Sequence, residues 1–498
     1  MNHPLIIQIN TRIVLGERAG QLRRPATLDD VTDAYLDDIA AKGFQWVWLL
    51  GVWQTGLVGR QISRTDPKLR EAYLHVLPDV REDDICGSPF AIVAYEVNRD
   101  FGGDAALARL RARMAKRHLK LLLDFVPNHT APDHPWVATH PEFYVHGSEE
   151  DLAREPQNYV RSGSGKGATI LACGRDPYFD GWADTLQLNY RHGGFREAQL
   201  GVLASIAERC DGVRCDMAML VQPEIFQRTW GDRALPSDGQ PPCDVPFWPE
   251  AITAVRRRHP SFMFVAEVYW DMEYELQQAG FDYTYDKRLY DRLRASAAAP
   301  VRAHLMATTE YQDHSLRFLE NHDEPRAASA FSPPVHRAAA VVTFLARGLR
   351  FFHEGQLEGR KVQVSVHLGR RPNEPVDADL HAFYDRLLRV LARPEVHAGS
   401  WQQWSCRQAW EGNGTHDQLL VSSWQADDRR LLSVVNFGGA QAQGYVSLTM
   451  AGLAGRRFKL VDLMGTAAYE RDGDGLAGNG LYLDVAPWAH HVFELRPS

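Results

Sequence analysis

The sequence has few cysteines and no long hydrophobic run. Six of its 498 residues are cysteine, and no two of them form a Cys-x-x-Cys pair or have the spacing of a metal site. In a chain of this length, scattered cysteines are typical of reduced thiols, which argues against a disulfide-stabilised secreted fold. No window approaches eighteen consecutive apolar residues, so we expect no membrane-spanning helix.

A basic stripe and a secretion signal are also missing. The net charge is -8, and no face-forming cluster of lysine and arginine stands out, which argues against a nucleic-acid partner. The opening residues, MNHPLIIQIN, contain neither a basic segment before a long apolar stretch nor a small-residue cleavage site. We therefore expect a cytoplasmic protein with no nucleic-acid or membrane partner.

The sequence has ordinary globular composition, and strand patterns alternate with helical patterns along most of it. Hydrophobic residues make up 45% and charged residues 24%. PLIIQIN is followed by a helical pattern over residues 27–43 with Thr27 as N-cap, and then by the apolar run FQWVWLLGV. Similar pairs continue to about residue 398. Eight short strands separated by helices predict an α/β fold, the (β/α)8 or TIM barrel.

Two segments depart from this alternation. Residues 130–189 are irregular and rich in Gly, Pro, Asp and aromatics, which predicts an inserted domain after strand three. From residue 399 the helical patterns stop and strand patterns recur at regular spacing, which predicts a C-terminal all-β sandwich. We therefore predict a catalytic barrel over residues 1–129 and 190–398, an inserted domain over 130–189, and a sandwich over 399–498.

Polar residues stand at the ends of four predicted barrel strands, where barrel enzymes place their active sites. They are Asp124, Asn128 and His129 after strand three, Arg214 and Asp216 after strand four, Glu267 after strand five, and His322 and Asp323 after strand seven. Any one of them alone could be a cap or part of a structural ion pair. Together they form a rim with more carboxylates than cations, which suits the developing positive charge of glycoside hydrolysis.

The segments DFVPNH, GVRCD, AEV and ENHD, in this order, resemble the conserved segments of the α-amylase family, glycoside hydrolase family 13. The likeness extends to the whole layout of barrel, insertion and sandwich. It implies that Asp216 is the nucleophile, that Glu267 is the acid/base, and that Asp323 holds and distorts the sugar.

The same resemblance implies further contacts to that sugar. His129 and His322 would bind it, Arg214 would keep Asp216 ionised, and Asp124 would support Arg214. It implies a retaining glycoside hydrolase that acts on α-linked gluco-oligosaccharides through a covalent glycosyl-enzyme, with a small carbohydrate as its partner and no cofactor. Two alternatives stay open: a glycosyltransferase of the same fold with a sugar or phosphate acceptor, and a silent relative that binds sugar.

Met219 and Leu220 depart from the family pattern. They stand where starch-degrading members carry Lys-His, which contacts the next sugar and helps to hold calcium. Apolar side chains can do neither, so we predict no metal site and a preference for short oligosaccharides over starch. A differently built calcium site in the insertion stays open, from four acids: Asp151, Asp176, Asp180 and Asp184.

Several aromatic and basic residues are weaker candidates. The segment GSPFAIVAY replaces the family's Gly-Tyr before a stacking aromatic, so Phe90 or Tyr95 is expected as the platform under the sugar. Other candidates for sugar stacking are Trp53, Trp136 and Trp182. Arg370 and Arg371 lie after strand eight and have two interpretations, a site for a phosphate or anionic acceptor and a solvated loop.

Overall fold

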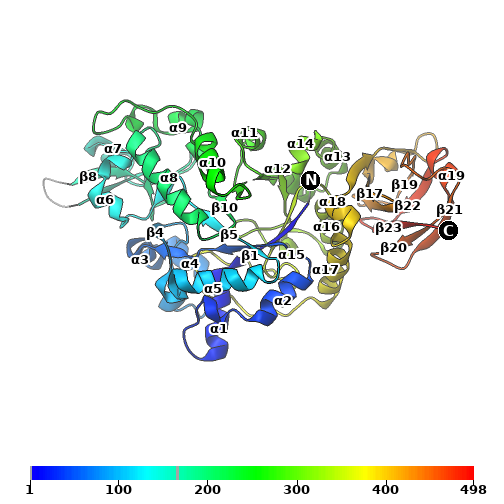
Figure 1. The fold of residues 1–498 in the computed structure, drawn as a ribbon, viewed down its shortest axis with the longest axis horizontal. Helices are drawn as coiled ribbons and strands as arrows, with labels where there is room; N and C mark the ends of the chain where they lie inside the picture. The colour runs from blue at the N-terminus through cyan, green and yellow to red at the C-terminus, as the bar shows by residue number, and fades with distance from the viewer. Residues whose placement is uncertain (1–2, 164–167) are drawn as a thin grey trace.

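A closed barrel of eight parallel strands lies at the centre of the molecule (Figure 1). The structure is a computed structural model that describes residues 3–163 and 168–498, so residues 164–167 of the predicted insertion lie outside it. The strands are β1 (Leu5–Asn10), β2 (Trp46–Leu50), β5 (Lys120–Phe125), β10 (Gly212–Cys215), β11 (Met263–Ala266), β12 (Tyr283–Tyr285), β13 (Ser315–Arg317) and β14 (Leu349–His353). β14 pairs with β1 and closes the ring, which confirms the predicted barrel.

Helices cover the outside of the barrel, because its apolar strands would otherwise face water. The main ones are α1 (Thr11–Leu22), α2 (Asp33–Ala41), α5 (Gly103–Ala115), α8 (Gly193–Ala207), α10 (Phe247–Arg258), α12 (Lys287–Arg294), α16 (Pro333–Phe344) and α17 (Ala378–Leu391). The predicted helix over 27–43 is shorter than expected. Thr27 begins only a single 3-10 turn, and the side chain of Thr32 caps α2 because Val31 is extended.

Short strand pairs and helices form the region between β5 and α8. β6 (His129–Thr130) pairs with β9 (Leu186–Gln187), and β7 (Tyr159–Ser162) pairs with β8 (Thr169–Ala172). This region projects from one side of the barrel (Figure 1). The exact domain boundaries remain predictions.

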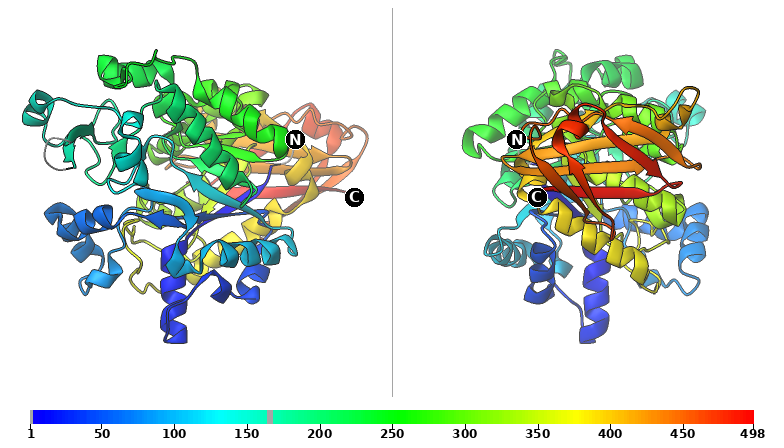
Figure 2. Two further views of the ribbon diagram at one scale, coloured as in Figure 1. Left: turned by 60° about the vertical axis from the view of Figure 1, so that its left-hand side comes forward. Right: turned by 90° about the vertical axis from the view of Figure 1, so that its right-hand side faces the viewer.

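The C-terminal region is all antiparallel sheet apart from two short helical segments. A six-stranded sheet has the order β15-β17-β18-β23-β20-β21, and a three-stranded sheet the order β16-β19-β22. Their bounds are β15 (Ser400–Trp404), β16 (Cys406–Gln408), β17 (Leu419–Ala426), β18 (Arg429–Asn436), β19 (Ala442–Val446), β20 (Arg457–Asp462), β21 (Ala468–Asp472), β22 (Leu481–Val485) and β23 (His490–Pro497). The region packs on the side of the barrel away from the insertion (Figures 1 and 2), where Trp424 donates to the Leu345 carbonyl.

The barrel register brings the polar strand ends together. Arg214 on β10 is level with Asp124 on β5 and with Val265 on β11. Because all eight strands are parallel, their carboxyl ends share one rim. No helix of the described ranges has the length and apolarity needed to cross a bilayer.

Candidate active site

Arg214 lies at the centre of the rim and binds two carboxylates at once. Its Nη1 lies 2.5 Å from Asp216 Oδ1, and its Nη2 lies 2.7 Å from Glu267 Oε2. Residues two apart on a strand project to the same side, so the sequence itself aims Asp216 at Arg214. The cross-strand pairing of β10 with β11 brings in Glu267.

Aromatic rings enclose this guanidinium. Its Cζ lies 5.3 Å from the ring centroids of both Trp48 and Phe90 and 5.8 Å from that of Tyr285. Burial alone would lower the pKa of Arg214, but the carboxylates of Glu267 and Asp216 raise it well above its usual value. Arg214 therefore stays protonated, buried from water and surrounded by three aromatic rings.

Asp216 and Glu267 are both almost inaccessible, with exposures of 5% and 3%. Burial raises the pKa of Asp216, and Arg214 opposes the rise. Burial also raises the pKa of Glu267, to about 7, with Arg214 opposing and the carboxylate of Asp216 adding to the rise. Two acids beside one cation suit a pair in which one stays ionised and the other holds a proton.

Two further groups hold Glu267, and the motifs gave no sign of them. The backbone N–H of Met217 donates to Glu267 Oε2 at 2.7 Å, and the Tyr269 hydroxyl donates to Oε1 at 3.0 Å. Met217 has a φ of +42°, in the left-handed region that non-glycine residues rarely adopt. This backbone conformation follows directly after Asp216 and directs the amide at the acid.

His322 and Asp323 lie side by side after β13. His322 Nε2 is 3.1 Å from Asp323 Oδ2 and makes no hydrogen bond among the described residues. Gln8 on β1 holds the opposite ring nitrogen, with its Nε2 2.8 Å from Nδ1. Burial lowers the pKa of His322 well below its usual value, so the ring is neutral.

Asp323 is the accessible member of the carboxylate group. Water reaches 47% of its side chain. Its surroundings raise its pKa to about 6, chiefly by partial desolvation, and Arg214 opposes the rise.

The three carboxylates open into one cavity of about 290 Å³. Asp216, Glu267 and Asp323 line it together with His129, while Arg214 and His322 support them from behind. Burial lowers the pKa of His129 to about 3, so it meets a ligand as a neutral ring. The structure thus brings all six predicted site residues together.

The inserted region supplies one wall of this cavity. Trp182, Asp184 and Thr185 line it, and the Trp182 ring lies 5.2 Å from that of His129. Burial raises the pKa of Asp184 to about 6, and its Oδ2 has no hydrogen-bond partner among the described residues. The sequence identified Asp184 only as a calcium candidate, but the structure places it in the wall of the cavity that Asp216 and Glu267 also line.

The aromatic candidates separate clearly. Phe90 and Trp182 line the cavity. Trp53 is fully buried and donates from Nε1 to the Asp124 carbonyl, so the prediction that it stacks on sugar is wrong. The Tyr95 hydroxyl is held by the Val126 backbone.

Two other candidates have structural contacts. Trp136 packs against Phe143 and Phe195 and does not line the cavity that holds the three carboxylates. Asp124 accepts from Trp48 Nε1 at 2.9 Å and from the Gly51 N–H at 2.7 Å. It therefore supports Arg214 through its charge rather than through a direct ion pair.

The donors of the calcium site that starch-degrading members of the family carry are not in place. Met219 and Leu220 are buried in a short 3-10 helix, and Asn128 Oδ1 accepts from Gln187 at 3.0 Å. Within residues 3–163 and 168–498, no three acidic, histidine or cysteine side chains are grouped to hold a metal ion. The residues present do not fit the calcium site of the starch-degrading members.

Arg370 and Arg371 are committed to carboxylates of their own chain. Arg370 binds Asp79 and Asp84, and Arg371 binds Glu17 and Glu354. Both guanidinium groups are therefore neutralised in place, and neither lines the cavity that holds Asp216, Glu267 and Asp323. These ion pairs argue against the interpretation of the pair as a phosphate site, and both residues lie in a loop with side chains that are 31% and 12% exposed.

Comparison with protein families adds the identity of the fold. The model of the α-amylase catalytic domain matches residues 93–374, more than half of the chain. The chain belongs to the α-amylase family. It is 24% identical over 446 residues to α-amylase MalA of Haloarcula japonica, a match that covers 87% of this chain and 55% of that protein.

Other α-amylase-family proteins are similar over shorter stretches or in fold alone. An α-1,4-glucan:maltose-1-phosphate maltosyltransferase of Burkholderia pseudomallei is 26% identical over 271 residues, 53% of this chain and 19% of that protein. The chain thus spans about half the length, or less, of these curated relatives. The crystal structure of a maltogenic α-amylase from Thermotoga neapolitana superposes with a TM-score of 0.68 at 18% identity, covering 99% of this chain and 98% of that one.

Proposed function

We propose that this α-amylase-family enzyme is a retaining glycoside hydrolase that acts on short α-linked gluco-oligosaccharides. The observation that carries the proposal is the single guanidinium of Arg214 bound to both Asp216 and Glu267 at the base of a cavity. A covalent glycosyl-enzyme requires a nucleophilic carboxylate and an acid/base carboxyl about 5–5.5 Å apart, and two carboxylates bound to one guanidinium support that close spacing.

In the first step, an Asp216 oxygen attacks the anomeric carbon while Glu267 gives its proton to the departing glycosidic oxygen. The sugar becomes an ester of Asp216, and Glu267 becomes a carboxylate. In the second step, Glu267 removes a proton from water, the water oxygen bonds to the anomeric carbon, and Asp216 departs as a carboxylate. Asp323 and the neutral His322 bind hydroxyls of the same sugar, and Phe90 packs against its apolar face.

Transfer to a second sugar is the alternative supported by a specific observation. The wall formed by Trp182 and Asp184 lies next to the catalytic acids, where an acceptor sugar would dock. An acceptor hydroxyl would then replace water in the second step. The ion pairs of Arg370 and Arg371 give no support for a phosphate acceptor at those residues.

The test is product analysis with and without the nucleophile. Wild-type enzyme, Asp216→Asn and the surface control Asp83→Asn are incubated with maltose to maltoheptaose, isomaltose, sucrose, trehalose and maltose 1-phosphate. We expect Asp216→Asn to lose at least about 10⁴-fold in turnover and Asp83→Asn to match wild type. Retention of more than a few per cent of activity in Asp216→Asn would remove that residue from its role. Longer products than substrate would favour transfer over hydrolysis.

A further inference from the structure

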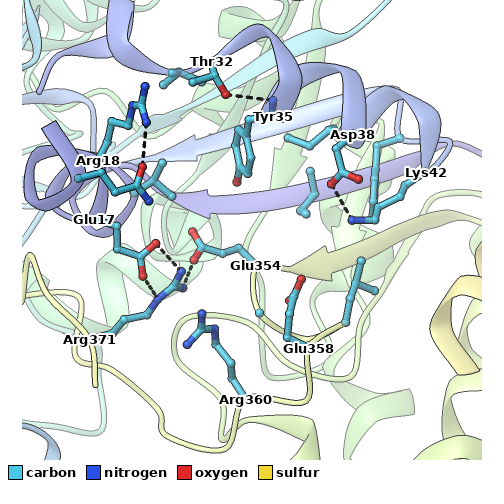
Figure 3. A pocket seen from close by; sticks show the side chains of 18 of the residues that line it. Glu17, Arg18, Thr32, Tyr35, Asp38, Lys42, Glu354, Glu358, Arg360 and Arg371 are labelled. Atoms are coloured by element: carbon cyan, nitrogen blue, oxygen red, sulfur yellow. Dashed lines mark hydrogen bonds and ion pairs between the residues drawn. The ribbon is translucent and has the colours of Figure 1, made fainter. Parts of the chain in front are cut away.

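A second cavity, of about 370 Å³, opens on the outside of the barrel. It lies between α1, α2 and the loop that follows β14 (Figure 3). It shares no lining residue with the catalytic cavity. Its volume is in the range of small-molecule sites in proteins.

The floor of this cavity is apolar. Ile7 from β1, Ile39 from α2 and Phe44 form part of it, and Val14 and Leu357 complete it. The ring of Tyr35 stands in the wall, with its hydroxyl directed toward the centre (Figure 3). A ligand that fits needs an apolar face of its own to replace the water on this floor.

The rim of the cavity is charged but nearly balanced, with five acidic and four basic side chains. Several are already paired: Arg371 with Glu17 and Glu354, and Lys42 with Asp38 at 2.6 Å. An anionic or a cationic ligand would therefore lie near side chains of its own charge and be repelled by them. The balance favours a neutral ligand that both donates and accepts hydrogen bonds.

Three polar side chains of the cavity have unused hydrogen-bonding capacity. Glu354 is 7% exposed, and its Oε2 has no partner among the described residues. The carboxylate of Glu358 makes no side-chain hydrogen bond or ion pair within the described ranges, and it points into the cavity (Figure 3). Arg360 Nε is likewise buried without a partner there. Buried polar atoms are normally satisfied, so Glu354 and Arg360 have capacity for a donor and an acceptor, and the partly exposed Glu358 can accept a further donor from a ligand.

We propose that this cavity is a second saccharide site for one or two neutral sugar units. Sugar hydroxyls would donate to Glu354 and Glu358 and accept from Arg360, and the apolar face of the ring would pack on Tyr35 and Phe44. Neutral sugars combine hydroxyl donors and acceptors with such a face, which matches both the floor and the rim. The class of ligand follows from the cavity alone, whereas the choice of maltose as the probe rests on the proposed function.

The test is calorimetric titration of maltose into Glu267→Gln enzyme, which binds sugar without turning it over. The titration runs to about 10 mM, where a ligand with a Kd near 1 mM is close to saturation. We expect two sites. Adding Glu358→Ala should weaken one of them at least tenfold. Tyr35→Phe keeps the ring but removes the hydroxyl that points into the cavity and can bond a sugar hydroxyl, so it should weaken the same site. Glu71→Ala, an exposed glutamate on α4 (Pro67–Val76), is the matched control and should leave both sites unchanged.

The outcomes distinguish a failure of the second-site proposal from a failure of the proposed function. A single site that Glu358→Ala abolishes supports the second site and counts against maltose binding at the catalytic acids. A single site, or a pair of sites, that Glu358→Ala leaves unchanged overturns the second site. Binding of inorganic phosphate in place of maltose, lost in the Glu358→Ala protein, would also overturn it, because the ligand would then be an anion.

Discussion

Replacing Arg214 by methionine tests the central geometry of the site. Among the described residues, Arg214 has the only guanidinium that contacts both Asp216 and Glu267, and the change removes it. The side chains of these two acids are 7% and 4% exposed. Methionine has a similar length and suits the aromatic rings that surround the guanidinium, so we expect β10 to keep its place. The perturbation is therefore chiefly electrostatic.

The magnitude follows from the burial of the two acids. Removing one partner of a buried ion pair costs about 3–5 kcal/mol, because a charge is left without compensation. Arg214 lowers the pKa of both acids, so both pKa values rise when it is lost. Loss of a contacting opposite charge is worth about 1–3 pKa units. Asp216 is then more easily protonated, and we expect kcat/KM at pH 7 to fall by about 10³-fold or more.

The sign of the pH dependence makes the test specific. Acids whose folded pKa is raised contribute stability that is fully present below their unfolded pKa, about 4, and is lost as pH rises through the folded pKa. For Glu267 in the wild type that loss accumulates as pH rises from about 4 and is complete above about 7. In Arg214→Met both acids must ionise without a cation. The deficit, meaning the loss in free energy of unfolding relative to wild type, should therefore be small near about pH 5 and reach about 3–5 kcal/mol by about pH 8.

Urea denaturation of both proteins across this pH range measures the deficit. Arg370→Met is the matched control, because it also breaks ion pairs with two acids, Asp79 and Asp84. The pKa of Asp84 is already held below its usual value, so the control deficit should be flat from about pH 5 to 8. A deficit for Arg214→Met that is equally flat, or kcat/KM near the wild-type value at pH 7, would refute the reasoning.

Three shorter predictions follow. Tyr269→Phe removes a donor to the ionised form of Glu267, so the alkaline limb of the kcat/KM profile should move up by a fraction of a pH unit; an unmoved limb would contradict the contact. Burial alone would raise the pKa of Asp286, but Arg317 and neighbouring donors hold it at about 2, so its stabilisation is present above about pH 4 and is lost as pH falls through 2. Asp286→Asn should lower the free energy of unfolding by about 3 kcal/mol at neutral pH. It should also weaken the pH dependence of that free energy between about pH 4 and 2, and an unchanged urea midpoint would contradict the prediction. Chelator should leave the melting temperature unchanged and maltotriose should be cleaved faster than starch, and the reverse of either would show the inference from the missing calcium donors to be wrong.

The barrel and the cluster of acids were predictable because both depend on local patterns. A strand such as β10 is a short apolar run, and a residue just past its end must lie on the rim of a parallel barrel. Asp216 and Glu267 could therefore be assigned to one rim without any knowledge of side-chain contacts. Their separation along the chain does not matter, because the parallel strands of the barrel place their carboxyl ends next to one another.

The groups that hold the site could not be predicted, because they depend on long-range packing. Gln8 contacts His322 from 314 residues away, and no periodicity in the sequence links them. Met217 acts through its backbone in a left-handed conformation that favours glycine, so its residue type gives no signal. Asp184 became part of the cavity only because the insertion folds back over the barrel rim.

Local signals also failed where two interpretations were equally good. In the segment TLDDVTD, both Thr27 and Thr32 have the preferred residue type for an N-cap, and only the extended backbone at Val31 decides between them. Arg370 and Arg371 have the same ambiguity, because a pair of arginines after a strand is solvated, ligand-binding or ion-paired according to which acids reach it. Acids distant in the chain, Asp84 and Glu17 among them, decided the case.

A single cation shared by two acids also explains how one carboxyl can serve first as an acid and then as a base in the proposed mechanism. In the free enzyme Arg214 compensates one of the two charges, so the pair retains a proton near neutral pH, and the raised pKa of Glu267 places that proton where the first step needs it. Once Asp216 becomes an ester it carries no charge, and the whole field of Arg214 acts on Glu267. The pKa of Glu267 must then fall, which makes the carboxylate the stable form when water has to be deprotonated. The shared contact therefore does more than orient the nucleophile, because it couples the protonation state of Glu267 to the covalent state of Asp216.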